Sequence, residues 1–428
     1  MRRVLLPLAL ASALAAVLPG QVSLAELPAL ARARAEKQRE SGEKALGPYW
    51  ADLALEYKGN EKFLDKRIAE VAALGESVAP LLLERLAPAK GGAEARQLAA
   101  NCRRVLEQMD TSAVVDALVE LATGSNEVGR GEGIRLLGAS GSPRAAKTLD
   151  AMLATGDADE KQLVVQALTR LRSTTSTPRI VAMLTVENRK EREAALDFLV
   201  AVRPAGAVDA ALGAMAKEKD AKLLQLHAQF LGATAREHDG AARALLDLLD
   251  MGTLDASDTR RLVESLARVA PAGHKPTIER LLVILDSDEA GSLTLEACTT
   301  LKALGDRSGL EKTFRSINKQ LAEPRRKRDA SLYELRGNLY FAVEKWSDAL
   351  DDFEKAVAYS DSRSLSRRSL VMMARTEAHR RKWSAVLKHL QAAEVGVADV
   401  ENLCRQDPAM QEAMQQDTLK AWLTGLGK

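Results

Sequence analysis

The side chains best suited to chemistry are five histidines and three cysteines, and their spacing indicates no metal or catalytic site. A zinc site needs His and Cys at characteristic short spacings, such as the His-Glu-x-x-His pattern on one helix. The sequence has neither that pattern nor a Cys-x-x-Cys pair, and its carboxylates do not cluster at ligand spacing. We therefore predict no metal, no cofactor and no catalytic residue. The residues considered are His227, His238, His274, His379, His389, Cys102, Cys298 and Cys404.

Two short motifs each match part of a known enzyme motif, but the other parts of that motif are missing from the sequence. Gly129, Gly131 and Gly133 partly match a nucleotide-binding loop, but no strand precedes them and the last glycines are too close together. We interpret them as a flexible entry to a helix. Ser41 and Lys44 have the Ser-x-x-Lys spacing of some acyl-transferring enzymes, yet the partner motifs are missing.

The cysteines fit a helical core better than a disulfide framework. Cys102 has a leucine four residues away on each side, and Cys298 has one three residues away on each side. Residues at that spacing share one face of a helix, where a thiol packs as a small apolar group. The three cysteines are also far apart in the sequence, so we predict no designed set of disulfides.

The composition indicates the elements that must carry any site. The chain has 428 residues, 46% hydrophobic and 28% charged, but only 4% are aromatic. Ala, Leu, Glu, Lys and Arg favour helix, and the scarcity of β-branched and aromatic runs argues against sheet. Because 61 basic residues are balanced by 59 acidic ones, a nucleic-acid partner is not expected. The composition predicts an all-α protein.

The N-terminus has the pattern of an export signal. Arg2 and Arg3 precede an apolar run over residues 4–18, and small residues follow at Ser23-Leu24-Ala25. We expect residues 1–25 to be a signal peptide and the protein to be periplasmic or extracellular. An uncleaved membrane anchor or a buried first helix is the alternative. No later segment is apolar enough to predict a membrane span.

Regularly spaced turns indicate a helical repeat. Apolar helical stretches end in turns about every 33 residues, which is the spacing of a solenoid of stacked helix pairs. Ser142-Pro143 and Thr177-Pro178 add a capping hydroxyl before a proline at the expected start of a second helix. The turns follow or lie near Leu74, Leu106, Leu137, Leu171, Val202, Leu231, Val269 and Leu304.

These repeats resemble the HEAT family. The segments FLDKRIAEVAALGESVAPLLLERL (63–86) and VVQALTRLRSTTSTPRIVAMLT (164–185) each look like one HEAT-type unit. The resemblance covers 61–323 and implies an α-α superhelix of antiparallel helix pairs; an irregular helical bundle is the alternative. Residues 26–60, which carry aromatic residues at their end, are expected to form an N-terminal helical cap.

Aromatic residues mark a change of packing after the basic run at residues 325–328. Seven aromatic residues lie between Tyr333 and Trp383, whereas the repeats before them have very few. The basic run itself suggests a contact patch, a protease site or simply a solvated turn. From residue 330 the order Gly337, Tyr340, Trp346, Ala349, Phe353 and Ala356 resembles a tetratricopeptide repeat, with a degenerate second copy after it. The resemblance implies tetratricopeptide-like repeats with C-terminal capping helices over 324–428.

The tetratricopeptide resemblance implies a binding groove lined by the first helix of each pair. Carried onto this sequence, the groove candidates are Glu334, Asn338, Phe341, Arg368, Arg375 and His379. A groove that clamps a peptide carboxylate would need a basic residue in place of Glu334. Only Asn338 and Arg375 fit such a clamp, so capture of a peptide C-terminus is not expected.

Two functions are compatible with these features. The first is a non-enzymatic scaffold of the periplasm or cell envelope, which binds a partner protein through the concave solenoid face and the groove. The second is an accessory or catalytic protein similar to the HEAT-like chromophore lyases, which act on a bound tetrapyrrole. That alternative requires a pocket of His, Cys or carboxylate side chains on the concave face.

Overall fold

The fold was analysed in a computed structural model, which describes residues 29–56, 60–86, 92–109, 115–125, 127–286 and 290–426. The predicted signal peptide, residues 1–25, lies outside this part and stays a prediction. The chain forms two compact units, residues 1–234 and 235–428, each of which is considered separately. This division falls inside the predicted array 61–323. The predicted domain ranges remain predictions, because a repeat array has no single core that would define them.

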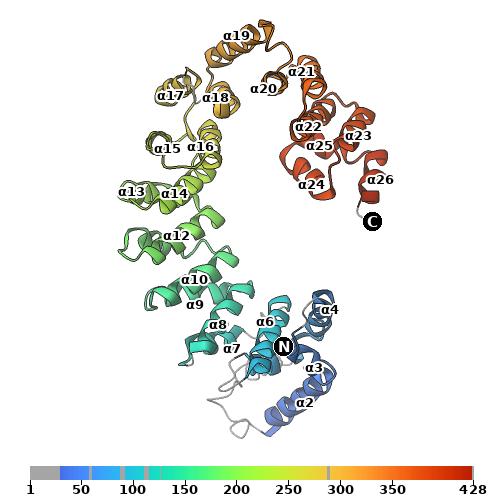
Figure 1. The fold of residues 1–428 in the computed structure, drawn as a ribbon. Helices are drawn as coiled ribbons and strands as arrows, with labels where there is room; N and C mark the ends of the chain where they lie inside the picture. Colours follow the sequence, from blue (N-terminus) through green and yellow to red (C-terminus); the bar gives the residue numbers. More distant parts are fainter. Residues whose placement is uncertain are drawn as a thin grey trace, which may run out of the picture. The chain divides into compact units, whose positions relative to one another are not determined.

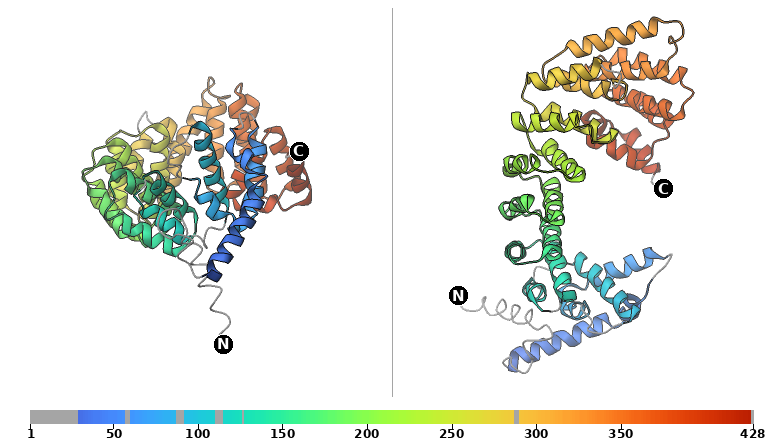
Figure 2. Two further views of the ribbon diagram at one scale, coloured as in Figure 1. Left: turned by 90° about the horizontal axis from the view of Figure 1, so that it is seen from below. Right: turned by 60° about the vertical axis from the view of Figure 1, so that its left-hand side comes forward.

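Unit 1 is a stack of helices joined by short turns (Figures 1 and 2). Its described α-helices are α2 (Ala29–Leu46), α3 (Trp50–Ala54), α4 (Glu61–Ala72), α5 (Ala79–Leu83), α6 (Ala93–Gln108), α7 (Val115–Thr123), α8 (Glu127–Ala139), α9 (Pro143–Met152), α10 (Ala158–Arg170), α11 (Thr177–Ala182), α12 (Arg189–Val202), α13 (Val208–Met215) and α14 (Ala221–Thr234). The described residues between them also form the short 3-10 helices η2 (Gly75–Ser77), η4 (Met183–Thr185) and η5 (Ala205–Ala207).

Unit 2 continues with longer and more regular helices. They are α15 (Asp239–Asp250), α16 (Ala256–Val269), α17 (Lys275–Asp286), α18 (Ala290–Ala303), α19 (Ser308–Ala322), α20 (Ala330–Ala342), α21 (Trp346–Tyr359), α22 (Arg363–His379), α23 (Trp383–Ala392), α24 (Val397–Gln406), α25 (Pro408–Ala413) and α26 (Asp417–Leu426). No strand occurs in the described part of either unit.

Within each unit, alternate helices form a row in which each helix packs on the next. In unit 1 this first row is α4, α6, α8, α10, α12 and α14, and in unit 2 it is α16, α18, α20 and α22. The helices between them pack beside the row, as α7 does on α8 and α17 on α18. The predicted fold class is confirmed: the protein is an all-α solenoid of antiparallel helix pairs. Each turn predicted from the sequence lies within a few residues of the end of a first-row helix.

A left-handed residue ends the first-row helices and sets the repeat. From α8 to α22, every such helix is followed within four residues by a residue with φ between 48° and 89°. Glycine adopts this conformation without strain, but five of the eight positions carry Arg or Glu. The reversal of the chain is therefore imposed by packing at those five positions. The residues are Gly141, Arg172, Arg203, Glu237, Gly273, Gly305, Glu344 and Arg381.

Ion pairs connect neighbouring repeats, both between first-row helices and between the helices beside them. Lys161 Nζ lies 3.0 Å from Glu191 Oε2, 30 residues further on, and Arg189 Nε lies 2.7 Å from Asp220 Oδ2, 31 residues further on. Because this separation equals one repeat, each pair crosses from one helix pair to the next. We call these contacts the inter-repeat rungs. Further rungs are Arg103–Glu132, Arg130–Glu160, Arg179–Asp150, Arg280–Asp250 and Arg367–Asp399.

The predicted helix N-cap is confirmed at the start of α9 and is wrong by one residue at the start of α11. Ser142 is the N-cap of α9, and its Oγ accepts a hydrogen bond from Arg144 N at 3.2 Å. At α11 the N-cap is Ser176, because Thr177 is already helical. The Thr177 hydroxyl is buried and has no hydrogen-bond partner, so it does not cap the helix as predicted.

The glycines of the nucleotide-like motif serve helix packing. Gly129, Gly131 and Gly133 lie inside α8, past its entry. A Cβ at position 133 would lie 2.5 Å from Ala122 N of α7, so only glycine permits this approach. Gly138, near the end of α8, allows an equally close contact with Ala167 of α10.

Among the described helices, none is both long enough and apolar enough to span a membrane.

Candidate functional site

The candidate site lies in unit 2, where α20, α22 and α24 expose neighbouring faces. Each helix starts at a defined cap: Asp329 Oδ1 accepts from Ser331 N and Leu332 N, and Ser362 Oγ accepts from Leu365 N. At α24, Asp399 Oδ2 accepts from Gly396 N at 3.1 Å. These caps fix the helix ends, and so the side chains that face the site are held on rigid elements.

The ring of Phe353 fills the space between α20 and α21. A Cβ at position 337 would lie 2.8 Å from Cε1 of Phe353, which is fully buried. A two-fold hydrogen-bonded ion pair, with Arg336 Nε and Nη2 donating to Asp352 at 2.6 and 2.7 Å, joins the same helices. This bond is the main reason that the pKa of Arg336 is raised. Together these contacts hold α20 against α21.

A groove runs between α20, α22 and α24, with a cavity of about 380 Å³. Its floor is apolar and its rim is polar and charged, which is the usual character of a ligand site in proteins. The floor residues are Val371, Met372, Val395 and Leu403, and the rim residues are Glu334, Asn338, Arg367, Arg368, Asp399 and Asn402. We call this set of residues the groove.

The charges of the groove rim neutralise one another. Arg368 donates through Nε and Nη2 to both oxygens of Glu334 at 2.9 and 3.0 Å, and this bond is the main cause of its raised pKa. Arg367 Nη2 donates to Asp399 Oδ2 at 2.7 Å. One pair joins α22 to α24, and the other joins α22 to α20. A ligand would therefore meet apolar floor residues beside fixed ion pairs, with no net charge on the rim.

A second cluster lies further along α20 and α22. The Phe341 ring packs edge-on against His379, and the guanidinium of Arg375 lies 5.0 Å from its centroid. Trp346 stacks on His379 with ring centroids 4.5 Å apart. The side chains of Arg375 and His379 both meet the carboxylate of Asp407, which is 2% exposed: Arg375 Nε is 2.9 Å away and His379 Nε2 is 3.2 Å away.

The six residues predicted from the sequence thus fall into two groups. Glu334, Asn338 and Arg368 line the groove, whereas Phe341, Arg375 and His379 belong to the cluster around Asp407. Arg375, one half of the clamp considered above, already holds a carboxylate of its own chain. Sequence reasoning missed Arg367, Val371 and Met372 of α22. It also missed residues that follow the second predicted repeat: Val395, Asp399, Asn402, Leu403 and Asp407. The Asp407-Pro408 pair was a usable signal, because Asp407 caps α25.

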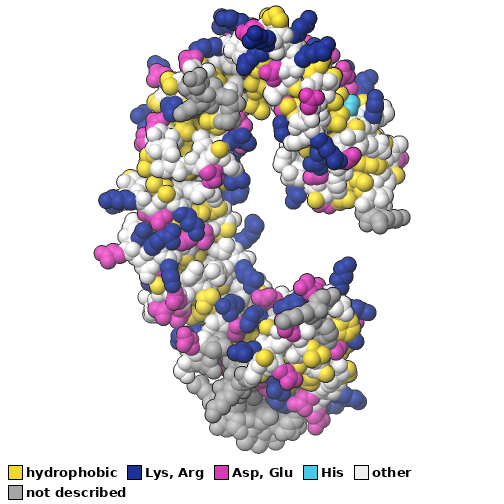
Figure 3. Space-filling view, in the orientation of Figure 1, with side chains coloured by type: hydrophobic (Ala, Val, Ile, Leu, Met, Phe, Trp, Pro, Cys, Tyr) yellow, Lys and Arg dark blue, Asp and Glu magenta, His cyan; other side chains and the backbone are white. Residues whose placement is uncertain are grey.

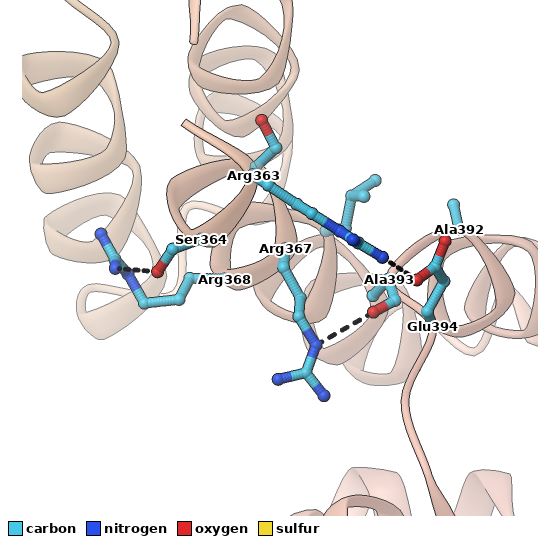
Figure 4. A pocket seen from close by; sticks show the side chains of 9 residues that line it. Arg363, Ser364, Arg367, Arg368, Ala392, Ala393 and Glu394 are labelled. Atoms are coloured by element: carbon cyan, nitrogen blue, oxygen red, sulfur yellow. Dashed lines mark hydrogen bonds and ion pairs between the residues drawn. The ribbon is translucent and has the colours of Figure 1, made fainter. Parts of the chain in front are cut away.

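A second and larger cavity, of about 660 Å³, lies beside the groove and shares Arg367 and Arg368 with it (Figure 4). Figure 4 shows Arg363 reaching toward Glu394, while Arg367 Nε donates to the Ala393 carbonyl at 3.1 Å. Arg368 Nη1 donates to Ser364 Oγ at 3.1 Å. Each of these guanidinium groups already has a partner in the chain, so we do not interpret the cavity as a separate anion site. It adds to the rim of the groove.

The other reactive side chains are buried or structural. Burial raises the pKa of the Cys102 thiol to about 12 and also raises that of Cys298, which disfavours thiolate chemistry at both. His274 bonds Thr277 Oγ1 at 2.7 Å and Asp239 Oδ1 at 3.1 Å, but Thr277 is fully buried, so this arrangement serves the start of α17. The described residues contain no group of three or more His, Cys, Asp or Glu side chains that could hold a metal ion together.

The sequence matches no family model and no curated protein. Similar solved structures include an engineered protein, with 18% identity, a TM-score of 0.34 and coverage of 95% of this chain and 97% of that one. The karyopherin Kap121p bound to the extreme C-terminus of the protein phosphatase Cdc14p has 12% identity and a TM-score of 0.40. Kap121p alone has 13% identity and a TM-score of 0.37. Both matches cover 97% of this chain, which spans about half (53%) of the length of Kap121p.

Proposed function

We propose that this chain is a non-enzymatic scaffold that binds a partner protein through the groove of unit 2. The single observation that carries the proposal is the apolar floor of the groove, which stays partly exposed at Val371, Met372 and Leu403 beside two fixed ion pairs. Buried apolar contact supplies most of the affinity of such sites, and a polar rim supplies orientation. A short protein segment with one or two apolar side chains fits a cavity of about 380 Å³.

The proposal includes the family character and the location of the protein. We assign α20–α23 as two tetratricopeptide-like pairs that follow HEAT-like repeats, since Gly337 packs on Phe353 and the groove is lined by first helices. Export to the periplasm or cell envelope rests on the N-terminal sequence alone. The concave face of the solenoid would add contact area to that of the groove. No observation favours the chromophore-lyase alternative, because both carboxylates of the groove are paired with arginines.

Site-directed photo-cross-linking tests the groove directly. A cross-linker at Asn402, which is exposed on the groove rim, should capture one protein in cells that express the chain. The same probe at Glu401, the exposed neighbour outside the groove, is the matched control and should not capture it. Cell fractionation of the same strain would test the location.

The captured protein is then purified and its affinity measured. The double variant Val371→Glu with Leu403→Glu places two charges on the apolar floor and should weaken binding at least about tenfold. Lys388→Glu, on the exposed face of α23, should leave the affinity unchanged. Equal affinity of the groove variant and the wild type, or equal capture from positions 401 and 402, would contradict the proposal.

A further inference from the structure

The turn between α19 and α20 presents a dense group of positive charges. Arg325, Arg326, Lys327 and Arg328 follow one another and are all exposed. Residues 315–328 carry six cationic side chains and one carboxylate, Glu323. Figure 3 shows Lys and Arg side chains gathered at the top of the view, over α19 and this turn. We call the six residues the basic corner: Arg315, Lys319, Arg325, Arg326, Lys327 and Arg328.

The basic corner lacks the carboxylate partners found along the repeats. The rungs pair a cation with an acid of the next repeat, as Arg367 pairs with Asp399. Within the described residues, no ion pair joins any of the six cations of the corner to a carboxylate. Arg326 Nη1 donates to the side-chain oxygen of Gln320, and Arg315 Nε donates to the Glu311 carbonyl at 3.4 Å. The positive charge is therefore left for an external partner.

The backbone of the turn is fixed, so the charges are presented in a defined arrangement. Arg326 N donates to the Glu323 carbonyl at 3.0 Å, and Asp329 N donates to the Arg326 carbonyl at 3.0 Å. Tyr333 of α20 donates its hydroxyl to the Lys327 carbonyl at 3.1 Å. A surface that is ordered before binding loses less conformational entropy when it binds.

An aromatic ring lies at the edge of the corner. Tyr359, at the end of α21, is 38% exposed, and the guanidinium of Arg328 lies 5.8 Å from its ring centroid. Its ring is 5.7 Å from that of Tyr333, over which Lys355 Nζ lies at 5.6 Å. Tyrosine has an apolar body and a polar tip, and both parts are favoured where water meets lipid headgroups.

We propose that the basic corner docks on an anionic phospholipid surface. Neither cavity described above is lined by a corner residue, so the partner must present its negative charges on an open surface. Arginine binds phosphate through two parallel hydrogen bonds, and several cations together attract an anionic bilayer strongly. The exposed Tyr359 favours a lipid interface over a purely polar polyanion. This docking is separate from the groove and does not depend on the partner protein.

Vesicle sedimentation with the full chain tests the proposal. Phosphatidylcholine vesicles with about 30% phosphatidylglycerol should bind the protein at about 0.1 M salt, whereas phosphatidylcholine alone should bind much less. The variant with Arg325, Arg326, Lys327 and Arg328 all changed to Gln should lose about 100-fold in partition coefficient. Circular dichroism checks that this variant remains folded, as expected for four exposed side chains.

A charge-matched control separates the corner from net charge. Lys382, Lys388, Arg405 and Lys420 are exposed in the same unit but dispersed, and changing all four to Gln removes the same charge. Binding within about threefold of wild type in this control supports the proposal. Equal losses in the two variants, or equal binding of the wild type to neutral vesicles, would overturn it. Tighter binding of the wild type to poly-glutamate or to duplex DNA than to anionic vesicles would also overturn it.

Discussion

The repeats of unit 1 and the helix pairs α20–α23 of unit 2 bring helices together by different means. In unit 1, α8 meets α10 where a Cβ on Gly138 would lie 2.6 Å from Ala167 Cα, a contact of backbone with backbone. In unit 2, the space opposite Gly337 is filled by the ring of Phe353. One arrangement of helix pairs thus arises from two packing schemes. The first depends on the absence of side-chain atoms, and the second on the presence of one large ring.

The largest expected effect on stability comes from removing the ring of Phe353. Phe353→Ala should lower the free energy of unfolding of unit 2 by about 3–5 kcal/mol, because a fully buried ring leaves a cavity. Urea unfolding followed by tryptophan fluorescence measures this, since Trp346, Trp383 and Trp422 all lie in unit 2. Tyr359→Ala, on the same helix but partly exposed, is the control and should cost less than about 1 kcal/mol. Equal effects of the two changes would show that the ring does not organise the pair.

The next largest effect is on the pH dependence of stability, and it involves one histidine in each unit. His227 in α14 is buried with an unpartnered Nδ1, and burial lowers its pKa to about 4, against an ordinary value of 6.5. The folded state therefore binds a proton less readily than the unfolded state. Stability due to this group is complete above pH 6.5 and falls as the pH drops toward 4, by roughly 3 kcal/mol in total. His379 in unit 2 instead has partners, because it stacks on Trp346 and contacts Asp407.

His227→Leu tests this difference. The gap in unfolding free energy between pH 7 and pH 5 should be about 2 kcal/mol smaller in the variant than in the wild type. Urea unfolding of unit 1, followed by circular dichroism, gives both values. His379→Leu, which removes a stacked and hydrogen-bonded ring of unit 2, shows how much the same change alters stability where the ring has partners. If the unfolding free energy depends on pH in the same way in His227→Leu and in the wild type, protonation of His227 does not destabilise the folded state, and the prediction is wrong.

The smallest expected effects on stability are those of replacing two glycines of α8 by alanine. Gly138→Ala should destabilise unit 1 by about 1–3 kcal/mol, because the new Cβ meets backbone atoms of Ala167 that cannot move aside. Gly131→Ala, two turns earlier in α8, meets only the end of Leu163 at 3.9 Å. It should stabilise the helix by up to about 1 kcal/mol through higher helix propensity. Thermal unfolding of the two variants gives the sign of each, and equal signs would contradict the packing described for α8.

The fold could be predicted from the sequence because its signals are local and repeated. Turns such as Leu137-Gly138 and Leu171-Arg172 recur once in each repeat and lie at the ends of first-row helices. The left-handed residues could not be recognised, since Arg203 and Glu344 carry no sign of a positive φ. Neighbouring helices force that conformation on them, and one sequence does not reveal such forces.

The site was predictable only as far as the resemblance to tetratricopeptide repeats reaches. Glu334, Asn338 and Arg368 were predicted because that resemblance implies a groove lined by the first helix of each pair, where residues at regular spacing share one face. Asp399 and Asp407 lie more than 30 residues from the arginines with which they pair, Arg367 and Arg375, and in a different helix. The docking of the C-terminal segment on α22 brings them there. That contact depends on the packing of several helices at once, which local patterns do not encode.

The inter-repeat rungs also bear on how this chain can change in length. Lys161 reaches forward by one repeat to Glu191, while Lys190 reaches back by one repeat to Asp159. At this boundary each side therefore offers charges of both signs to the other. An in-frame duplication or loss of one whole repeat would place equivalent charges side by side again, whereas an insertion of a few residues would misalign every rung at that boundary. The ladder thus allows the array to grow or shrink in whole repeats and penalises smaller steps.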